Sequence, residues 1–358
     1  MTDSHMLPLA GDVGDVSYME FKTFGDKEYL ISSHWDCKIR GWEVEGGSSS
    51  RDVTSSFSFE AQTHKKPILS FAAKGDCIYT SSCDNTIKLW NIGSSIEPQI
   101  VGKHSKPVNH IRFIEECQCL LSTSWDASLC YWDVRTNFSN ENNPLLKIKF
   151  QGSIQAVDVQ YPLMICASAE RQLSVFDLRK PNVVFKKIQS PLKHATNSHA
   201  LKLFPDRHGF IVGSIEGRCG VHHILDEESG YNFAFKCHRE QNKIYNVHSI
   251  DFHPQYSTFA TTGGDGKFHF WDKDSKQRLR IFPKLDNTIP IGKFNRDGSL
   301  FAYAVCYDWS RGSEGPTNFD THLKPSVQIG IHKPAFTEIK NRGVPPYENK
   351  NSKSRIVE

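Results

Sequence analysis

The stretch SWDASLCYWD, Ser124 to Asp133, places two Trp-Asp pairs on either side of a short apolar run. Its pattern is an acidic residue, then an apolar residue, then an aromatic ring at intervals of three positions. The pattern recurs as SHWDCKIRGW, SSCDNTIKLW and GGDGKFHFW, and in weaker form as ASAERQLSVF and GSIEGRCGVHH. Successive acidic positions, with Asp308 as the seventh, are about 42 to 49 residues apart, which indicates a structural repeat.

A period of roughly 40 to 45 residues that ends in Trp-Asp is typical of a WD40 blade, a four-stranded antiparallel sheet. Runs such as CIYTSS and IKLWNI have the β-branched and aromatic content of short strands, and each acidic residue falls at a turn between two of them. One blade cannot bury both of its faces alone, so the blades must stack side by side. The repeats therefore predict an all-β, seven-bladed WD40 β-propeller over residues 16–332.

The segments outside the repeats are short. The first strand, VSYMEF, begins at Val16, which leaves residues 1–15 as an N-terminal segment that is predicted to latch onto the last blade. That blade lacks a clean Trp-Asp motif, and the strand it needs is SVQIGI at 326–331. The tail, 333–358, is polar, contains a Pro-Pro pair and accounts for the net charge of +3, so we expect it to be flexible. Contact with nucleic acid is an alternative role for its charge.

The composition, 38% hydrophobic and 23% charged, is that of an ordinary folded protein. No apolar run approaches the roughly 18 residues that span a bilayer, and no signal-peptide pattern is visible, so we expect an intracellular protein without membrane insertion. The ten cysteines include no CxxC and are predicted to be free thiols. Neither Cys117 with Cys119 nor His222 with His223 has the spacing of a zinc site, so no metal and no cofactor are expected.

The recurring acidic residues have an architectural interpretation. Four of them are assigned to blade turns: Asp36, Asp84, Asp126 and Asp265. Four indoles belong to the same motifs: Trp42, Trp90, Trp132 and Trp271. His64 and His104 precede two of the acidic residues, and with a strand Ser and the indole N–H they are predicted to form closed polar chains. A hydrolase triad would occur once instead of repeating, and no nucleophile elbow or phosphate loop is present, so an enzyme is not predicted.

At the level of individual blades the chain resembles a family, the mRNA-export WD40 propellers of the nuclear pore, or Rae/Gle type, which are related to the spindle-checkpoint WD40 propellers. The resemblance covers about 16–332. Its motifs are TSSCDNTIKLW, YPLMICASAERQLSVF, QSPLKH, FIVGSIEGR, FAFKCHR, TGGDGKFHFWDKDSKQRL and FNRDGSLFAYAVCYDWSRG. SIEGR and FKCHR are similar to both branches, whereas YDWSRG, QSPLKH and FWDKD favour the export branch.

The resemblance implies a monomeric adaptor in a heterocomplex, which binds a short acidic segment, the GLEBS motif, of an FG-repeat nucleoporin. In that family, basic residues in the SIEGR and FKCHR runs receive glutamates of the motif, and here they are Arg218 and Lys236. At a mainly apolar channel mouth such cations would prefer carboxylate partners, with roughly 1.5 to 3 kcal/mol for each charge-assisted bond. The alternative is that Arg218 pairs with Glu216 of its own blade.

The resemblance also implies a groove that contacts single-stranded RNA or a messenger ribonucleoprotein. Its residues would be Arg239 of FKCHR with Trp309 and Arg311 of YDWSRG, since a Trp beside an Arg can stack a base and pair a phosphate. Trp309 as an inward-facing anchor of the last blade is the alternative.

In cells, the resemblance implies locations in the nucleus, at the nuclear pore and envelope, and in the cytoplasm. The second function that it leaves open is a spindle-checkpoint adaptor, which would bind a GLEBS segment of a kinetochore kinase or scaffold.

Overall fold

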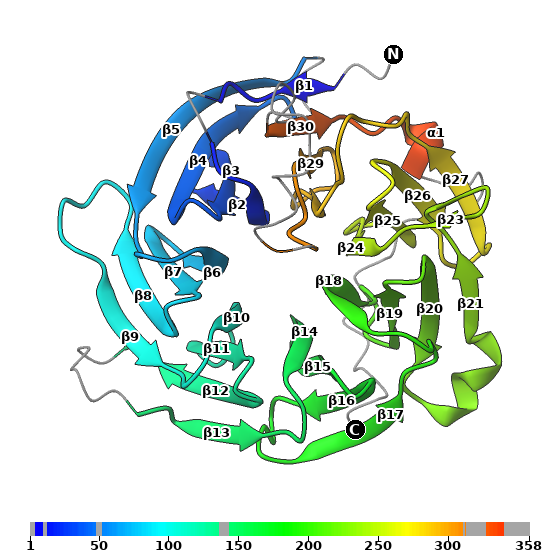
Figure 1. Ribbon diagram of the computed structural model, residues 1–358, viewed down its shortest axis with the longest axis horizontal. Coiled ribbons are helices and arrows are strands. Elements are labelled where there is room, and N and C mark those ends of the chain that lie inside the picture. Colours follow the sequence, from blue (N-terminus) through cyan, green and yellow to red (C-terminus); the bar gives the residue numbers. More distant parts are fainter. Residues whose placement is uncertain are drawn as a thin grey trace.

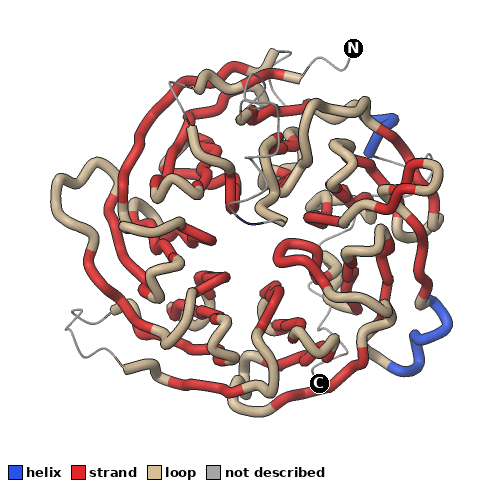
Figure 2. Tube along the Cα trace, in the orientation of Figure 1, coloured by secondary structure: helices blue, strands red, loops and turns tan. Residues whose placement is uncertain are grey.

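The computed structural model describes residues 4–9, 13–47, 52–135, 143–310, 312 and 327–339, with the side chains of 197 and 198 excepted. Within these ranges strands dominate, and the helical segments are a 3-10 helix, η1 (Asp226–Tyr231), and one turn of α-helix, α1 (Phe336–Ile339) (Figure 2). No helix in this part of the chain is long and apolar enough to cross a membrane.

The strands form antiparallel groups of four that are arranged in a ring around one axis (Figure 1). Two neighbouring groups are joined into one eight-stranded sheet by a single parallel pair, His199 with Ser249. We call each group of four a blade and give its strands from the axis outward. Blade 1 comprises β2 (Val16–Phe24), β3 (Lys27–His34), β4 (Lys38–Glu45) and β5 (Thr54–Gln62). Blade 2 comprises β6 (Ile68–Lys74), β7 (Cys77–Ser82), β8 (Thr86–Asn91) and β9 (Gln99–Lys103). Blade 3 comprises β10 (Val108–Ile114), β11 (Cys119–Ser124), β12 (Ser128–Asp133) and β13 (Leu146–Lys149).

The second half of the ring follows the same order. Blade 4 comprises β14 (Ile154–Gln160), β15 (Leu163–Ser168), β16 (Gln172–Asp177) and β17 (Val184–Gln189). Blade 5 comprises β18 (Thr196–Leu203), β19 (Gly209–Ser214), β20 (Arg218–His223) and β21 (Phe233–Lys236). A small hairpin follows, made of β22 (Arg239–Glu240) and β23 (Lys243–Ile244). Blade 6 comprises β24 (Val247–Phe252), β25 (Thr258–Gly263), β26 (Phe268–Asp272) and β27 (Gln277–Ile281).

Blade 7 is assembled from both ends of the chain. Its strands are β28 (Ile291–Phe294), β29 (Phe301–Val305), β30 (Gln328–His332) and β1 (His5–Met6). The antiparallel register places His5 opposite Ile331, and Trp42 of blade 1 donates its indole N–H to the Pro8 carbonyl oxygen at 3.0 Å. The described residues thus contain seven four-stranded blades, and the prediction of an all-β WD40 propeller is confirmed.

The hydrophobic core lies between neighbouring blades. In one cluster Met19 of β2, Phe71 of β6 and Ile331 of β30 are all fully buried. Burying a large apolar side chain contributes about 1.5 to 3 kcal/mol, and here each such side chain needs an adjacent blade to cover it. The blades therefore depend on one another, as the repeat argument requires.

The ring has two different faces. The turns between the second and third strands of each blade, together with the connections between blades, lie on what we call the upper face. The turns between the first and second strands lie on the lower face. The upper mouth of the central channel is a cavity of about 220 Å³ with Trp35, Trp125 and Tyr307 in its lining, whereas the lower mouth is a cavity of about 540 Å³ with many charged side chains.

Candidate functional site

Blade 3 contains a complete buried polar chain on the upper face. His104 Nδ1 lies 3.1 Å from Asp126 Oδ2, and His104 Nε2 lies 2.8 Å from the Ser122 hydroxyl oxygen. Trp132 donates its indole N–H to the same hydroxyl oxygen at 2.8 Å. Because an ionised carboxylate can only accept, His104 donates to it from Nδ1–H, and in the neutral imidazole Nε2 then accepts the hydrogen bond from the Ser122 hydroxyl.

The charge of Asp126 is stabilised by these contacts. Burial acts to raise the pKa of Asp126, but hydrogen bonds from Ser128 and His104 outweigh it and hold the pKa below its usual value. The carboxylate therefore stays ionised at neutral pH, with each of its neighbours paired. Such an arrangement fixes the turn between the second and third strands of the blade.

Blade 2 repeats the chain with a threonine in place of the serine. His64 Nδ1 lies 2.8 Å from Asp84 Oδ2, and His64 Nε2 lies 2.9 Å from Thr80 Oγ1. Trp90 packs against Phe59 of blade 1, with ring centroids 5.7 Å apart. The indole thus contributes to the contact between blades.

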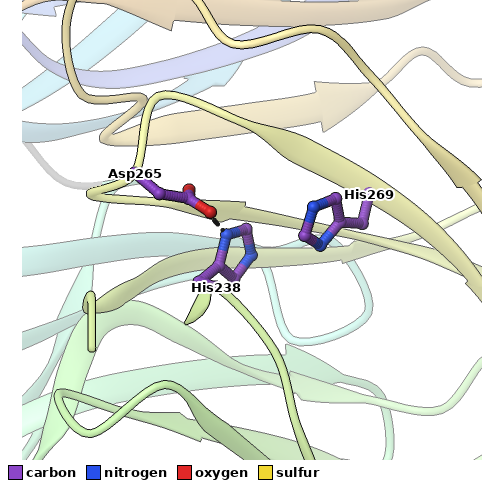
Figure 3. A group of neighbouring side chains, drawn as sticks. All are labelled: His238, Asp265 and His269. Carbon is purple, nitrogen blue, oxygen red and sulfur yellow. Dashed lines mark hydrogen bonds and ion pairs between the residues drawn. The ribbon is translucent and has the colours of Figure 1, made fainter. Parts of the chain in front are cut away.

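Blade 6 has the same chain, but its histidine was not predicted. His238 Nδ1 lies 2.8 Å from Asp265 Oδ1, its Nε2 lies 2.9 Å from Thr261 Oγ1, and Trp271 donates to that oxygen at 2.9 Å. Figure 3 shows His269 beside this pair, with its ring stacked on His238 at 4.6 Å. Three such side chains could in principle hold a metal ion. Both ring nitrogens of His238 are already engaged in hydrogen bonds, however, so this group fits a polar chain and not a metal site.

The hairpin between blades 5 and 6 explains why His238 was missed. His238 precedes Asp265 by 27 residues, whereas His64 and His104 precede their partners by 20 and 22. The strands β22 and β23 lie in this interval and lengthen the connection. A search at the usual spacing therefore passes over this histidine.

Blade 1 departs from the predicted pattern. Asp36 lies at its turn but pairs with Arg40, whose Nη2 is 2.7 Å from Asp36 Oδ2. The nearby His34 instead lies 2.7 Å from the Ser32 hydroxyl oxygen through Nε2. Trp42 donates to the N-terminal segment, as described above. At this turn an arginine takes the place of the histidine as the partner of the aspartate.

Three basic residues gather at the upper turn of blade 5, and we call them the blade 5 basic cluster: Arg218, Lys236 and Arg239. Arg218 and Lys236 are directly opposite each other in the register of β20 and β21. Arg239 donates from Nη2 to the Glu216 carbonyl oxygen at 2.8 Å and from Nε to the Gly217 carbonyl oxygen at 3.2 Å. Its guanidinium is thereby tied to the turn that precedes Arg218.

The cluster retains free charge. Arg218 Nε lies 3.9 Å from Glu216 Oε1, which is a distant pairing, and the Arg218 side chain is 38% exposed. Lys236 is exposed and makes no ion pair with any residue in the described ranges. The predicted position of these two residues at the channel mouth is wrong, because β20 and β21 are the two outer strands of blade 5.

Trp309 and Arg239, the two residues of the predicted RNA groove that the structure describes, contact different parts of the molecule. Trp309 stacks on Trp35 of blade 1 with ring centroids 4.1 Å apart, and it donates its indole N–H to Asp15 Oδ2 at 3.0 Å. Arg239 belongs to the cluster at the boundary of blades 5 and 6, and Arg311 lies outside the described residues. One face of the Trp309 ring is therefore covered, which favours the alternative interpretation of Trp309 as an anchor.

Asp308, the seventh acidic position, joins blade 7 to blade 6. Its Oδ2 lies 3.0 Å from His248 Nε2. Burial acts to raise the pKa of Asp308, but the contact with His248 and bonds from Ser310 outweigh it and lower the pKa to about 2. The partner histidine lies on β24, an inner strand, so the spacing used for the other blades does not find it.

Comparisons with known proteins agree with this architecture. The family model for the WD domain, G-beta repeat, matches residues 55–91, 97–133 and 231–272. The chain is 40% identical to "Protein RAE1" of Arabidopsis thaliana, over 91% of this chain and 89% of that protein. It is 38% identical to "Poly(A)+ RNA export protein" of Schizosaccharomyces pombe, over 88% of this chain and 87% of that protein. It is 35% identical to "mRNA export factor GLE2" of Chaetomium thermophilum, with the same coverage of both chains.

These identities extend over nearly the whole ring and not only over the generic repeat. They confirm the resemblance to the export branch that the YDWSRG, QSPLKH and FWDKD motifs indicated. They also confirm the prediction of a non-enzymatic protein, because these relatives are export factors. The chain belongs to the RAE1/GLE2 family of WD40 mRNA export factors.

Proposed function

We propose that the protein is an adaptor in mRNA export that binds an acidic GLEBS-type segment of an FG-repeat nucleoporin through the blade 5 basic cluster. The observation that carries the proposal is the pair of Arg218 and Lys236, which lie opposite each other on two strands, while Lys236 makes no ion pair within the described ranges. Two adjacent cations on a rigid sheet suit two carboxylates of an acidic peptide. The names of the relatives support a role in mRNA export, since two of these relatives are named as RNA export proteins.

The test is calorimetric titration of the purified protein with a GLEBS-type peptide. The double variant Arg218→Glu, Lys236→Glu should lose two charge-assisted bonds worth roughly 1.5 to 3 kcal/mol each, so affinity should fall more than about 100-fold. The matched control is Lys147→Glu, Lys149→Glu, which makes the same charge change at two exposed lysines of β13. Equal weakening in both double variants would attribute the effect to net charge and reject the site.

The proposed function implies a protein that moves between the nucleus, the nuclear pore and the cytoplasm. The checkpoint alternative would use the same cluster for a GLEBS segment of a kinetochore protein, so peptide binding does not separate the two. The place where a tagged protein accumulates during mitosis does separate them. Accumulation at kinetochores and not at the nuclear envelope would favour the checkpoint function.

A further inference from the structure

The lower half of the channel contains a ring of charged side chains that the proposed function does not use. Six inner strands contribute to it, and β2 contributes Lys22 in addition to Glu20. We call one charged residue from each of the six strands the lower ring: Glu20, Arg112, Asp158, Lys202, Asp251 and Lys293. The inner strand of the remaining blade, β6, contributes the methyl group of Ala72 instead. The ring is therefore interrupted at blade 2.

Around blades 4 to 7 the lower ring is internally paired. Lys202 Nζ lies 3.2 Å from Asp158 Oδ1 and 3.5 Å from Asp251 Oδ1. Lys293 Nζ lies 3.1 Å from Asp251 Oδ1. The second oxygen of each aspartate accepts a backbone N–H from the next blade, from Leu203 and Phe294 respectively, both at 2.9 Å. Two carboxylates thus hold two lysines and join four blades.

On the other side of the ring Arg112 has no such partner. No carboxylate of the described residues lies within 4.0 Å of its guanidinium, and the Nη1 group donates to the neighbouring Ile111 carbonyl oxygen at 2.8 Å. The guanidinium lies over the Tyr18 ring, 4.9 Å from its centroid. The carboxylate of Glu20, the third acidic member of the ring, lies 3.2 Å from Lys22 Nζ and pairs with it.

The lower ring has three cations and three carboxylates, so what it leaves open is the guanidinium of Arg112 and not a surplus of charge. The Nε and Nη2 groups of Arg112 make no hydrogen bond within the ranges that the structure covers. A guanidinium has a planar fork of donors that matches phosphate oxygens, which leaves these groups available to such a ligand.

The space for a ligand is present. The cavity of about 540 Å³ at the lower mouth has Arg112, Lys202, Lys293 and Tyr18 in its lining, and its volume lies in the range of small-molecule sites. We propose that the lower mouth binds the phosphate group of a small molecule, held by Arg112 with Lys202 and Lys293. This site lies on the opposite face from the blade 5 basic cluster, and it stands independently of the peptide-binding proposal.

The test adds the missing carboxylate to the ring. Ala72→Glu places an acidic group in the interruption beside Arg112, whereas Ala72→Gln adds a neutral side chain of the same shape. Inorganic phosphate serves as the probe, and the broadening of its phosphorus NMR line on addition of protein at fixed ionic strength reports binding. We expect wild type and Ala72→Gln to bind, and Ala72→Glu to bind at least about tenfold more weakly because the added carboxylate then competes with phosphate for Arg112.

A second variant, Arg112→Gln, should also lose the broadening, and Lys149→Gln on the outer strand β13 should retain it. If Arg112→Gln does not fold, the comparison of Ala72→Glu with Ala72→Gln still tests whether phosphate binds at the lower mouth. No broadening with wild type, or the same broadening with Ala72→Glu as with Ala72→Gln, would overturn the proposal.

Discussion

At the residue level, Asp126 shows what the recurring aspartates do. Its carboxylate receives hydrogen bonds from Ser128 and from His104, which in turn contacts Ser122. Replacing Asp126 with Ala leaves these buried donors without an acceptor, which should lower the free energy of unfolding by about 1 to 3 kcal/mol. Urea denaturation followed by tryptophan fluorescence measures the change.

The matched control for this substitution is Asp133→Ala. Asp133 pairs with Arg135, whose side chain is 68% exposed, so the loss of stability should be much smaller than for Asp126→Ala. If both substitutions lower the free energy of unfolding by the same amount, the buried polar chain of Asp126 stabilises the fold no more than an exposed ion pair does.

Buried histidines should make the protein sensitive to acid. Burial, with Arg40 nearby, lowers the pKa of His34 to about 4, and burial likewise lowers that of His253 to about 4. Between pH 6.5 and 4 the unfolded chain therefore binds more protons than the folded one, so stability falls as the pH falls through this window. For each of these two histidines, the free energy of unfolding should be roughly 3 kcal/mol lower at pH 4 than at neutral pH. A urea midpoint that stays constant from pH 7 to 4.5 would contradict this expectation.

The sequence predicted part of these polar chains and not the rest. His64 and His104 were identifiable because they precede an aspartate at nearly the same interval in two successive repeats. His238 was not, since a hairpin lengthens its connection, and Arg40 was not, since an arginine from the third strand can reach the same carboxylate. Spacing finds a partner only where the intervening backbone has its usual length.

At the level of elements, β1 is the strand on which closure depends. It is short, yet it pairs with β30 and is followed by Leu7, which is buried in the core shared by blades 1, 2 and 7. Deleting residues 1–7 should expose the edge of β30, and an exposed edge favours association with other chains. We expect a lower melting temperature in scanning fluorimetry and larger species in size-exclusion chromatography.

The control for this deletion removes residues 1–3 alone, which leaves His5 and Met6 to pair with β30. It should behave like the full chain. A full-length melting temperature after deletion of 1–7, with no change in elution, would show that three strands suffice for blade 7.

Element positions also explain the error over Arg218 and Lys236. The SIEGR and FKCHR motifs identify residues beside a turn, but they do not say how far from the axis the adjoining strands lie. Arg218 begins the third strand of its blade and Lys236 ends the fourth, so both lie toward the rim. The chemistry of the predicted pair is therefore unchanged, while its location moves from the channel to the outer part of the upper face.

For the whole molecule, the period of the Trp-Asp motif was sufficient to predict the class of fold. It was sufficient because each repeat is one sheet whose apolar faces need neighbours on both sides, so the number of repeats determines the number of blades. The lower ring could not be predicted in the same way. Its members lie on inner strands that carry no shared motif, and only the closed ring brings Arg112 near Lys202 and Lys293.

The closure of blade 7 has a consequence for synthesis in the cell. The ribosome releases β1 first, but its partner β30 is among the last strands made. At about 5 to 20 residues per second, roughly 15 to 65 s pass before the two can pair. During that interval the nascent chain carries an unpartnered first strand and an incomplete ring, so this protein should depend on chaperones that protect chains while they are still being translated.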